Sequence, residues 1–345
     1  MKEVRVGIIG LGFMGTTHFD IYKNNPKARI VAIADINPVK QSGDISAVAG
    51  NLGEGGNSQL DFSDIRTYHS GLELIQDPDI DLVDICTPVT THREFALAAL
   101  ATGKNVMVEK PFARTSQQAQ DIADAAKSSP GKVLVGQCIR YWPEYRHAGE
   151  LVKSGKAGKI RTASFKRVSP SIDGNGWENW FMKETLSGGA LLDLHLHDVD
   201  YVREIFGCPR SLSAFGAMGV RSDTGIDHVF ARFDYGNDAL ITLEGSWTPA
   251  KGTPFEMSFL IVGETLTIRM GAEGYQIIHE DGRIETPDIS NDAGPTGWHV
   301  EIDHLLSCIQ NDSDVGMDLD GVVESIRLIE AEEKSIRSNT PITLG

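Results

Sequence analysis

The stretch Val4-Arg-Val-Gly-Ile-Ile-Gly10-Leu-Gly12-Phe-Met-Gly15 decides the fold of this chain. A short apolar run leads directly into three glycines with the spacing GxGxxG, and a helical pattern follows them. At this spacing the first glycine permits a tight turn, the second lets the backbone approach a pyrophosphate, and the third allows close helix–strand packing. Free N–H groups at the helix start favour the anion. The stretch predicts a dinucleotide-binding loop formed by Gly10, Gly12, Phe13, Met14 and Gly15.

An acidic residue follows at the distance that a dinucleotide site requires. The second apolar run ends in Asp35, at the separation of about 20 positions from the last glycine that is typical of such sites. A carboxylate there can bind the ribose hydroxyls of the adenosine and repels a 2′-phosphate, so Asp35 favours NAD over NADP. The alternative for Asp35 is a capping or turn role before Asn37-Pro38.

Strands and helices alternate from the N-terminus to Gln137. Apolar runs of strand length occur at Val4–Gly10, Arg29–Asp35, Asp81–Cys86, Lys104–Glu109 and Lys132–Gln137. Helical patterns such as Thr91–Leu100 and Ser116–Lys127 lie between them. Apolar runs of this kind are typical of strands buried on both faces, and their alternation with helices implies right-handed βαβ units. Residues 1–137 are therefore predicted to form a doubly wound parallel sheet, with a surface connection at Gln41–Ser63.

The second part of the chain has a different pattern. Strands are predicted at Ile160–Val168, Ser211–Gly219, Val229–Tyr235, Ala239–Trp247, Phe255–Val262 and Thr265–Arg269. Turn sequences separate successive strands, which favours a largely antiparallel sheet. Helices are predicted at Glu144–Ser154, Trp298–Gln310 and Gly321–Ser338. Residues 138–345 are thus predicted to form an α+β domain whose helices are too few to cover both faces of its sheet, and we expect a homo-oligomer joined through that sheet.

Composition excludes several classes of protein. The 345 residues include 32 Lys and Arg against 48 Asp and Glu, a formal charge of −16. A nucleic-acid binder needs a basic face, and a membrane span needs about 18 consecutive apolar residues, which do not occur. The N-terminus lacks the pattern of a secretory signal, and four widely separated cysteines suggest neither a disulfide framework nor a zinc site. We expect a cytoplasmic protein with a small-molecule partner.

Two short motifs stand where predicted parallel strands end, at the edge where open α/β sheets bind ligands. Thr87-Pro88 follows one strand, and Glu109-Lys110-Pro111 follows the next. His92 begins the helix after Thr87-Pro88, and a structural hydrogen-bonding role for it is favoured over catalysis. These positions, Thr87, Pro88, His92, Glu109 and Lys110, are predicted to line the cofactor site.

The segment from Ser187 to Tyr201 carries the other candidate for chemistry. Asp193 and His197 stand at i and i+4 of a helical pattern, so their side chains share one face. A carboxylate that fixes the tautomer of an imidazole supports a general base, although such a pair can also be purely structural. His195 and His197 point apart at i and i+2, and further ligands at a recognisable spacing are lacking, so no metal is predicted.

The motifs together resemble the glucose–fructose oxidoreductase / inositol dehydrogenase / rhizopine catabolism (Gfo/Idh/MocA) family. They occur in the order Gly10-x-Gly12-x-x-Gly15, Thr87-Pro88-x-x-x-His92, Glu109-Lys110-Pro111 and Gly188-Gly189-x-Leu-x-Asp193-x-x-x-His197-Asp198-x-Asp200. The resemblance extends through Gln137-x-x-Arg140-Tyr141-x-Pro143 to the two closing helices. It implies a Rossmann domain, an open-faced sheet domain, and homodimers or homotetramers formed through the sheets. Val89 and His195 depart from residues that many members carry there.

The resemblance also implies a reaction. An NAD-dependent oxidoreductase would transfer hydride between the nicotinamide and a secondary hydroxyl of a sugar, sugar derivative or cyclic polyol. In this hypothesis His197 is the base, Asp193 orients it and Lys110 stabilises the alkoxide. The expected substrate-binding residues are Lys110, Arg140, Tyr141, Trp180, Asp193 and His197. An NAD-dependent glycosidase that uses transient oxidation stays open, as does a non-catalytic dinucleotide-binding regulator, which would not need all three catalytic residues.

Overall fold

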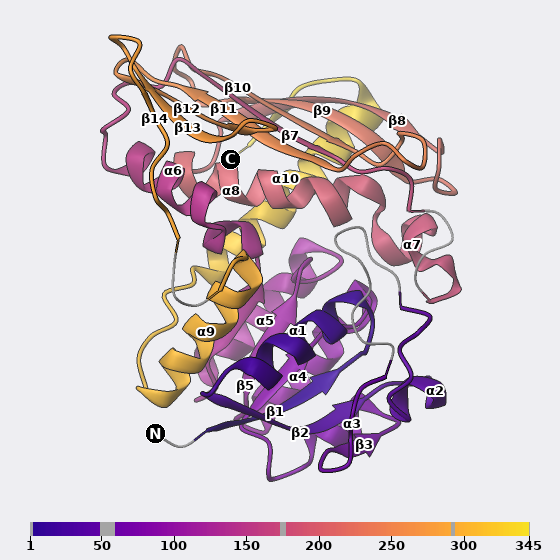
Figure 1. The fold of residues 1–345 in the computed structure, drawn as a ribbon. Coiled ribbons are helices and arrows are strands. Elements are labelled where there is room, and N and C mark those ends of the chain that lie inside the picture. Colours follow the sequence, from indigo (N-terminus) through magenta and orange to yellow (C-terminus); the bar gives the residue numbers. More distant parts are fainter. Residues whose placement is uncertain (1–2, 49–58, 173–176, 291–293, 345) are drawn as a thin grey trace. The chain divides into compact units, whose positions relative to one another are not determined.

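The computed structural model describes residues 3–48, 59–172, 177–290 and 294–344 (Figure 1). By their contacts the described residues divide into two compact units. The first unit takes in Met1–Cys138, Asn175–Glu178 and Trp298–Val323. The second unit takes in Ile139–Gly174, Asn179–Gly297 and Glu324–Gly345. Among the described residues, none of the helices has the length and apolar character that crossing a bilayer requires.

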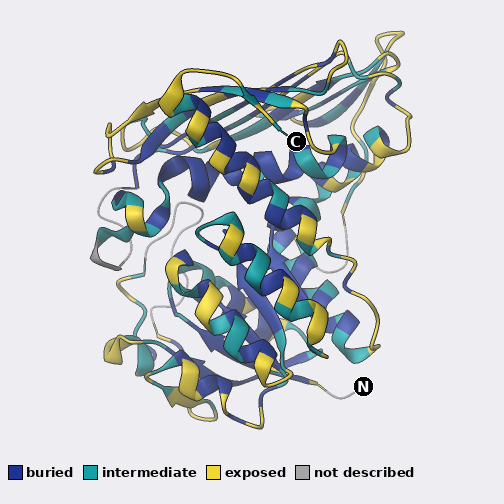
Figure 2. Cartoon of the chain, turned by 180° about the vertical axis from the view of Figure 1, so that it is seen from behind, coloured by how far each residue is buried: buried dark blue, intermediate teal, exposed yellow. Residues whose placement is uncertain are grey.

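The first unit contains a six-stranded parallel sheet with the order β3-β2-β1-β4-β5-β6. Its strands are β1 Val4–Ile9, β2 Ala28–Ala34, β3 Arg66–Tyr68, β4 Leu82–Ile85, β5 Asn105–Glu109 and β6 Val133–Gly136. The central strands are buried almost throughout, as the apolar runs predict (Figure 2). The strand order reverses between β1 and β4, where open α/β sheets bind their ligands. The predicted doubly wound parallel sheet is confirmed.

Helices flank these strands. They are α1 Phe13–Asn24, α2 Pro38–Gln41, α3 Gly71–Ile75, α4 His92–Ala101, α5 Ser116–Ser128 and α9 Gly297–Gln310. Side-chain caps begin three of them: Asn37 accepts from the N–H of Val39 at α2, Ser70 from that of Leu72 at α3, and Thr115 from that of Gln118 at α5. Of the predicted connection Gln41–Ser63, residues 49–58 lie outside the described part, and Asp44 pairs with Gln59 across its flanks.

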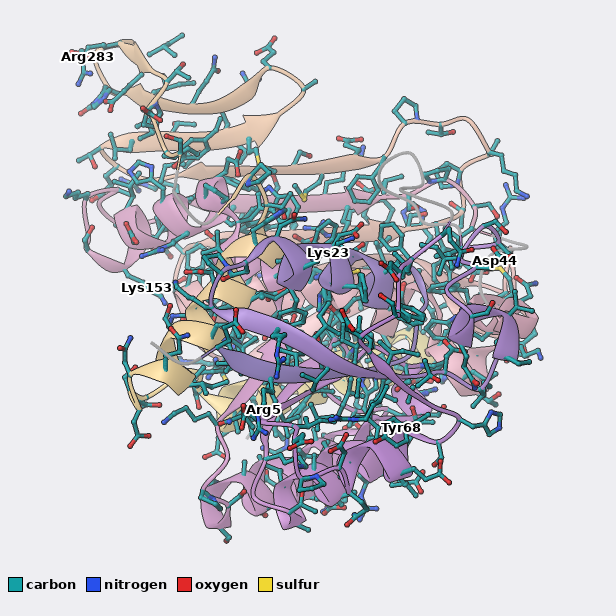
Figure 3. The ribbon with its side chains drawn as sticks, turned by 60° about the horizontal axis from the view of Figure 1, so that its bottom comes forward. Arg5, Lys23, Asp44, Tyr68, Lys153 and Arg283 are labelled. Carbon is teal, nitrogen blue, oxygen red and sulfur yellow. The ribbon has the colours of Figure 1, made fainter. Side chains whose placement is uncertain are left out.

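Charged side chains hold the start of β1 to the segments beside β3 and β4. Arg5 donates to both carboxylate oxygens of Asp81 at 2.8 and 2.9 Å, and Tyr68 donates to Asp77 at 2.9 Å. Figure 3 labels Arg5 and Tyr68 among the side chains of this unit. Arg66 of β3 donates to Asp77 as well, at 2.8 Å. The short, polar strand β3 is therefore supported by ion pairs more than by apolar burial.

The second unit contains a nine-stranded sheet with the order β14-β13-β12-β11-β7-β10-β9-β8-β15. Its strands are β7 Thr162–Val168, β8 Ser211–Met218, β9 Ile226–Asp234, β10 Leu240–Ser246, β11 Glu256–Val262, β12 Leu266–Gly271, β13 Gly274–His279, β14 Ile284–Glu285 and β15 Ile342–Thr343. The central pair β7 and β10 is parallel, and the other described pairs are antiparallel. The predicted largely antiparallel sheet is confirmed.

Helices pack on one face of this sheet (Figure 1). They are α6 Pro143–Lys153, α7 Glu184–Ser187, α8 Leu196–Phe206 and α10 Leu319–Ser338. Along β7 the side chains alternate, with Ala163 and Phe165 buried against the helices and Ser164 exposed on the other face. On β8, next to the edge strand β15, the backbone N–H of Ala214 donates to Ser335 of α10. One face of the sheet is covered and the other is open.

A buried ion pair fixes two of these helices to the sheet. Arg167 of β7 donates to both carboxylate oxygens of Asp198 in α8, at 3.0 and 3.1 Å. The same guanidinium donates to the Tyr145 hydroxyl of α6 at 3.2 Å. The side chains of Arg167 and Asp198 are 4% and 0% exposed, so water screens neither charge. The pair links three elements across the covered face.

Replacing Arg167 by Met should lower the free energy of unfolding by about 3–5 kcal/mol, because it leaves the Asp198 carboxylate buried and unpaired. Chemical denaturation of the two proteins measures the difference. Arg146→Met is the matched control: Arg146 pairs with Glu150 on the exposed side of α6, and this loss should cost less than about 1 kcal/mol. Equal effects of the two substitutions would contradict the assignment.

Candidate active site

The glycine loop has the geometry that its spacing predicts. Gly10 has a φ of +91°, and a Cβ there would lie 2.8 Å from the carbonyl oxygen of Cys86. A Cβ on Gly15 would collide with the carbonyl oxygen of Gly10, so the first turn of α1 can lie against the strand end only without a side chain. Around Gly12, at the N-cap of α1, a Cβ would meet no atom within 4 Å. The start of α1 is thus open to a ligand.

Asp35 lies directly after β2 and contacts the glycine loop. Its Oδ2 accepts from the backbone N–H of Leu11 at 2.8 Å, and its Oδ1 accepts from that of Asn37 at 2.8 Å. The contact with Asn37 fits the turn role that is the alternative for Asp35. The contact with Leu11 links the carboxylate to the glycine loop. The Lys40 ammonium lies 3.8 Å from Oδ2. The acidic side chain therefore stands beside the loop at the end of β2, as a ribose-binding carboxylate requires.

His92 joins the two motifs at the strand ends. Its Nε2 lies 2.7 Å from the carbonyl oxygen of Thr87, and its Nδ1 lies 2.7 Å from that of Pro111. Burial lowers the pKa of His92, whereas the two carbonyl oxygens, which only accept, favour a proton on each nitrogen. Pro88 precedes a 3₁₀ turn, Val89–Thr91, that leads into α4. His92 thus fixes the backbone after β4 to the backbone after β5.

Glu109 and Lys110 follow at the end of β5. The Glu109 carboxylate is buried, and its Oε2 accepts from the backbone N–H of Lys110 at 3.0 Å. Its Oε1 lies 3.3 Å from Nε2 of His18, a residue of α1 that the sequence motifs did not single out. Lys110 itself is half-buried. Within the first unit the structure thus brings the Glu-Lys-Pro motif, the Thr-Pro motif and the helix after the glycine loop together.

In the second unit, Asp193 and His197 stand on either side of a change in helix type. Gly188 and Gly189 have φ values of +80° and +71° and separate α7 from the next turn. The chain then forms a π-helical turn, Leu191–His195, before α8 begins. Asp193 is buried in this turn and His197 is half-buried in the first turn of α8. The predicted regular helix is therefore wrong at this point, and π-helical turns are frequent at functional sites.

His195 has a partner on another helix. Its Nε2 lies 3.0 Å from Oε2 of Glu332 in α10, and both side chains are fully buried. On the sheet side, a Cβ on Gly245 of β10 would lie 2.7 Å from the His195 Cβ, so only glycine leaves room for the ring. His195 therefore packs between β10 and α10, whereas the neighbouring His197 reaches solvent in part.

Three further expected substrate residues also belong to the second unit. The Arg140 guanidinium donates to both carboxylate oxygens of Asp200 at 2.7 Å and lies 3.3 Å from Glu204. Burial opposes its charge, but the Asp200 carboxylate outweighs that effect and raises the pKa of Arg140. Trp180 stacks on Phe181 with ring centroids 4.1 Å apart, and Tyr141 is half-buried. The ion pair with Asp200 thus holds Arg140 against α8. The rings of Trp180 and Phe181 pack on each other.

Comparison with known proteins identifies the family. The family model described as "Oxidoreductase family, NAD-binding Rossmann fold" matches residues 4–137. The model for the GFO/IDH/MocA C-terminal domain matches residues 145–269. The chain belongs to the Gfo/Idh/MocA oxidoreductase family. The first unit is accordingly an NAD-binding Rossmann fold. The description of the family confirms the predicted NAD cofactor for the family as a whole.

Relatives in this family are named as inositol dehydrogenases. A scyllo-inositol 2-dehydrogenase (NADP(+)) of Bacillus subtilis is 29% identical over 57% of this chain, although the match covers only 54% of that relative. A scyllo-inositol 2-dehydrogenase (NAD(+)) of the same organism is 26% identical over 99% of this chain and 96% of its own length. The crystal structure of a myo-inositol 2-dehydrogenase from Lactobacillus plantarum has a TM-score of 0.80 at 21% identity, with both chains covered completely, and shares the fold.

In this Gfo/Idh/MocA chain, Asp35 should determine the choice between the two nicotinamide cofactors. NAD should bind at least about tenfold more tightly than NADP, because the 2′-phosphate would lie beside a carboxylate. Asp35→Ser should narrow that difference. Lys40→Ala is the control, because it removes the nearby cation and should leave the preference for NAD intact. Fluorescence titrations of the three proteins with both cofactors measure the ratios, and an unchanged ratio in Asp35→Ser would refute this role.

Proposed function

We propose that the protein is an NAD-dependent dehydrogenase that transfers hydride between the nicotinamide and a secondary hydroxyl of a cyclic polyol, sugar or sugar derivative. The observation that carries the proposal is the open start of α1 at Gly12 with the Asp35 carboxylate bonded to the adjoining loop. The same chain retains Lys110, Asp193 and His197. Relatives named as inositol dehydrogenases support a cyclic polyol as substrate.

The proposed mechanism gives each of three residues one task. His197 removes the proton of the substrate hydroxyl, and Asp193 orients the imidazole and stabilises its charged form. Lys110 stabilises the alkoxide that develops as the proton leaves. NAD, when bound, supplies the hydride acceptor. In this proposal residues 1–137 hold the cofactor, and residues 138–345 bind substrate through Arg140, Tyr141 and Trp180 in addition to the catalytic residues.

Net formation of NADH tests the proposal. The purified protein is incubated with NAD and a panel of inositols, sugars and glycosides, and absorbance at the NADH band is followed together with product analysis. A dehydrogenase accumulates NADH in proportion to oxidised product. Release of a sugar from a glycoside without net NADH would identify a glycosidase instead. Tight binding of NAD with no conversion across the panel would favour a regulator.

His197→Ala should lower turnover by about 10²–10⁴-fold, the range expected when a general base is removed. NAD affinity should not change, because the expected cofactor-binding residues belong to the other unit. Asp193→Asn should cost less than His197→Ala, because Asp193 only orients the base. Turnover, NAD affinity and melting temperature are measured on the same proteins.

The matched control for His197 is His147→Ala. His147 is a half-buried histidine of the second unit whose Nδ1 lies 3.0 Å from the Tyr275 hydroxyl, so its loss should leave turnover near the wild-type value. A purely structural Asp193–His197 pair would lower the melting temperature, and turnover would fall only with the fraction of unfolded protein. A folded His197→Ala protein with normal turnover would rule out the mechanism.

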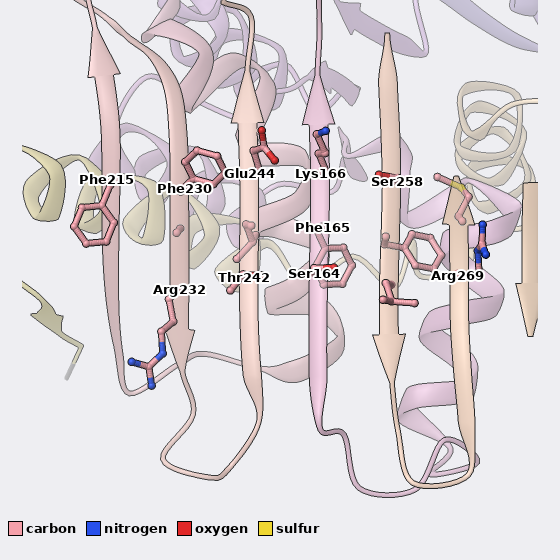
Figure 4. A pocket seen from close by; sticks show the side chains of 15 residues that line it. Ser164, Phe165, Lys166, Phe215, Phe230, Arg232, Thr242, Glu244, Ser258 and Arg269 are labelled. Atoms are coloured by element: carbon pink, nitrogen blue, oxygen red, sulfur yellow. The ribbon is translucent and has the colours of Figure 1, made fainter. Parts of the chain in front are cut away.

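We also propose that the open face of the nine-stranded sheet joins two copies of this chain. Phe215 of β8 and Phe230 of β9 lie opposite each other in the strand register and are 63% and 51% exposed (Figure 4). They border a shallow hollow of about 610 Å³. Lys166, Arg232 and Glu244 also line it. A twofold interface places such a surface against itself, so apolar side chains can be buried and opposite charges can pair.

Replacing both Phe215 and Phe230 by Asp should convert the oligomer to monomer, because four carboxylates would enter each twofold contact. Light scattering coupled to gel filtration at micromolar concentration measures the mass. Leu72→Asp is the control, since Leu72 is an exposed apolar residue, 39% accessible, on α3 of the first unit. A monomeric wild-type protein would contradict the proposed interface.

A cytoplasmic location is part of the same proposal. The four cysteines, Cys86, Cys138, Cys208 and Cys308, are all free thiols. Free thiols are usual where the surroundings are reducing.

A further inference from the structure

Five ionisable side chains meet in the interior of the Rossmann unit, in a group here named the His18 cluster. Its members are His18 of α1, Asp84 of β4, Cys86, Glu109 of β5 and Glu301 of α9. The histidine, Asp84 and Glu301 are 0% exposed, and Glu109 is 5% exposed. The proposed mechanism uses none of these groups for chemistry. Interiors seldom hold three carboxylates around one histidine unless a further positive charge compensates them.

A contact with Asp84 on one side of the ring fixes the orientation of His18. Its Nδ1 lies 2.8 Å from Oδ2 of Asp84, so this nitrogen carries the proton and donates to the carboxylate. The Cys86 thiol lies 3.3 Å from the other oxygen of Asp84, and burial raises the pKa of this thiol, which keeps it neutral. Nε2 therefore points to the opposite side, toward Glu109 and Glu301.

Four polar atoms on that side have no hydrogen-bond partner among the described residues. They are Nε2 of His18, Oε1 of Glu109 and both carboxylate oxygens of Glu301. One ligand atom each from His18, Glu109 and Glu301 lies within 4.8 Å of the other two. Two carboxylates buried this close repel each other, and burying a charged carboxylate without a partner is unfavourable by itself. A positive species between the three side chains would satisfy all four atoms.

We propose that His18, Glu109 and Glu301 bind a divalent transition-metal ion. The Nε2 of His18 and Oε1 of Glu109 are 3.3 Å apart, and two ligands about 2.1 Å from a tetrahedral ion lie about 3.4 Å from each other. One imidazole and two carboxylates suit Zn²⁺, Mn²⁺ or Fe²⁺, whereas Ca²⁺ and Mg²⁺ prefer oxygen ligands alone. The carboxylates of Glu109 and Glu301 neutralise the ion, and the carboxylate of Asp84 keeps its hydrogen bond from Nδ1 of His18.

The surroundings of the His18 ring match those of metal-binding histidines. Such a histidine almost always donates its other ring N–H to a carboxylate or carbonyl, which fixes the tautomer and the direction of the ligating nitrogen. For His18, the carboxylate that accepts from the other ring N–H is that of Asp84. The three ligands come from α1, β5 and α9, which lie far apart in the sequence, so no local motif could reveal the site.

The ion would act on structure and positioning and not on the reacting groups. It would tie α9 to β5 and to the helix that follows the glycine loop. Through Glu109, whose other oxygen accepts from the backbone N–H of Lys110, it would also hold the end of β5 in place. Without an ion, burial and the neighbouring Glu109 raise the pKa of Glu301 well above its usual range, and a proton would neutralise this carboxyl instead. Metal content distinguishes the two states.

Metal analysis of the full-length, tag-free protein tests the proposal. The wild-type protein, purified without chelator, should contain one Zn²⁺, Mn²⁺ or Fe²⁺ per chain by plasma mass spectrometry. Glu301→Gln should lose at least about 90% of it, because one charged ligand is gone. His279→Ala is the control, since His279 pairs with Glu285 on the surface at 3.1 Å and should leave the metal content unchanged.

A second measurement does not depend on the folding of a variant. Wild-type protein is stripped with a chelator, and its melting temperature is followed as Zn²⁺ or Mn²⁺ is added. The temperature should rise and then saturate at one equivalent, and Co²⁺ should give a visible absorption band of a bound ion. The proposal would be overturned if the protein is purified without metal, is not stabilised by any of these ions and gives no Co²⁺ band. A proton on Glu301 would then neutralise that carboxyl instead. Equal metal content in wild type and Glu301→Gln would also overturn it.

Discussion

The contact between Gly15 and the carbonyl oxygen of Gly10 is the constraint on which the first unit depends. Because Gly15 has no side chain, α1 can begin directly above the end of β1. That placement leaves the backbone at Gly12 open. It also carries His18, one turn further along α1, onto the end of β4 and toward β5. A single close backbone approach therefore determines both the ligand-binding edge of the sheet and the buried charges beneath it.

Sequence patterns predict the parts of this fold that rest on local rules. The buried parallel strands, the glycine loop and the helices α5 and α6 have apolar spacing or caps that the sequence displays. Such rules do not predict the strand β3, because Arg66-Thr-Tyr68 is short and polar. It is held to Asp77 by the ion pair of Arg66 and the hydrogen bond of the Tyr68 hydroxyl. The strand β13 is also missed, although it is buried on one face. Its pairing with β12 depends on a tight turn at Gly271–Gly274.

In the candidate site, too, local sequence motifs indicate some of the residues, whereas others depend on contacts between distant parts of the chain. Motifs at strand ends indicate Asp35, Lys110 and His92, because parallel topology collects strand ends at one edge. The π-helical turn before α8 could not be predicted, since no local pattern marks it. It follows the Gly188–Gly189 break, and its His195 packs on Gly245, which is distant in the sequence. Glu301 and His18 belong to opposite ends of the sequence, and only the tertiary fold shows that they meet.

The two histidines of the His-x-His sequence, His195 and His197, have different surroundings in the structure. In the second unit, Arg167 pairs with Asp198 and Arg140 pairs with Asp200. The Nε2 of His195 lies 3.0 Å from Glu332, so each of these buried side chains faces a carboxylate. The departure from the family pattern at His195 is thus accommodated by Glu332 on one side and by the absence of a side chain at Gly245 on the other. It changes the packing between β10 and α10. His197, half-buried at the start of α8, keeps the partial access to solvent that its proposed role as a base requires.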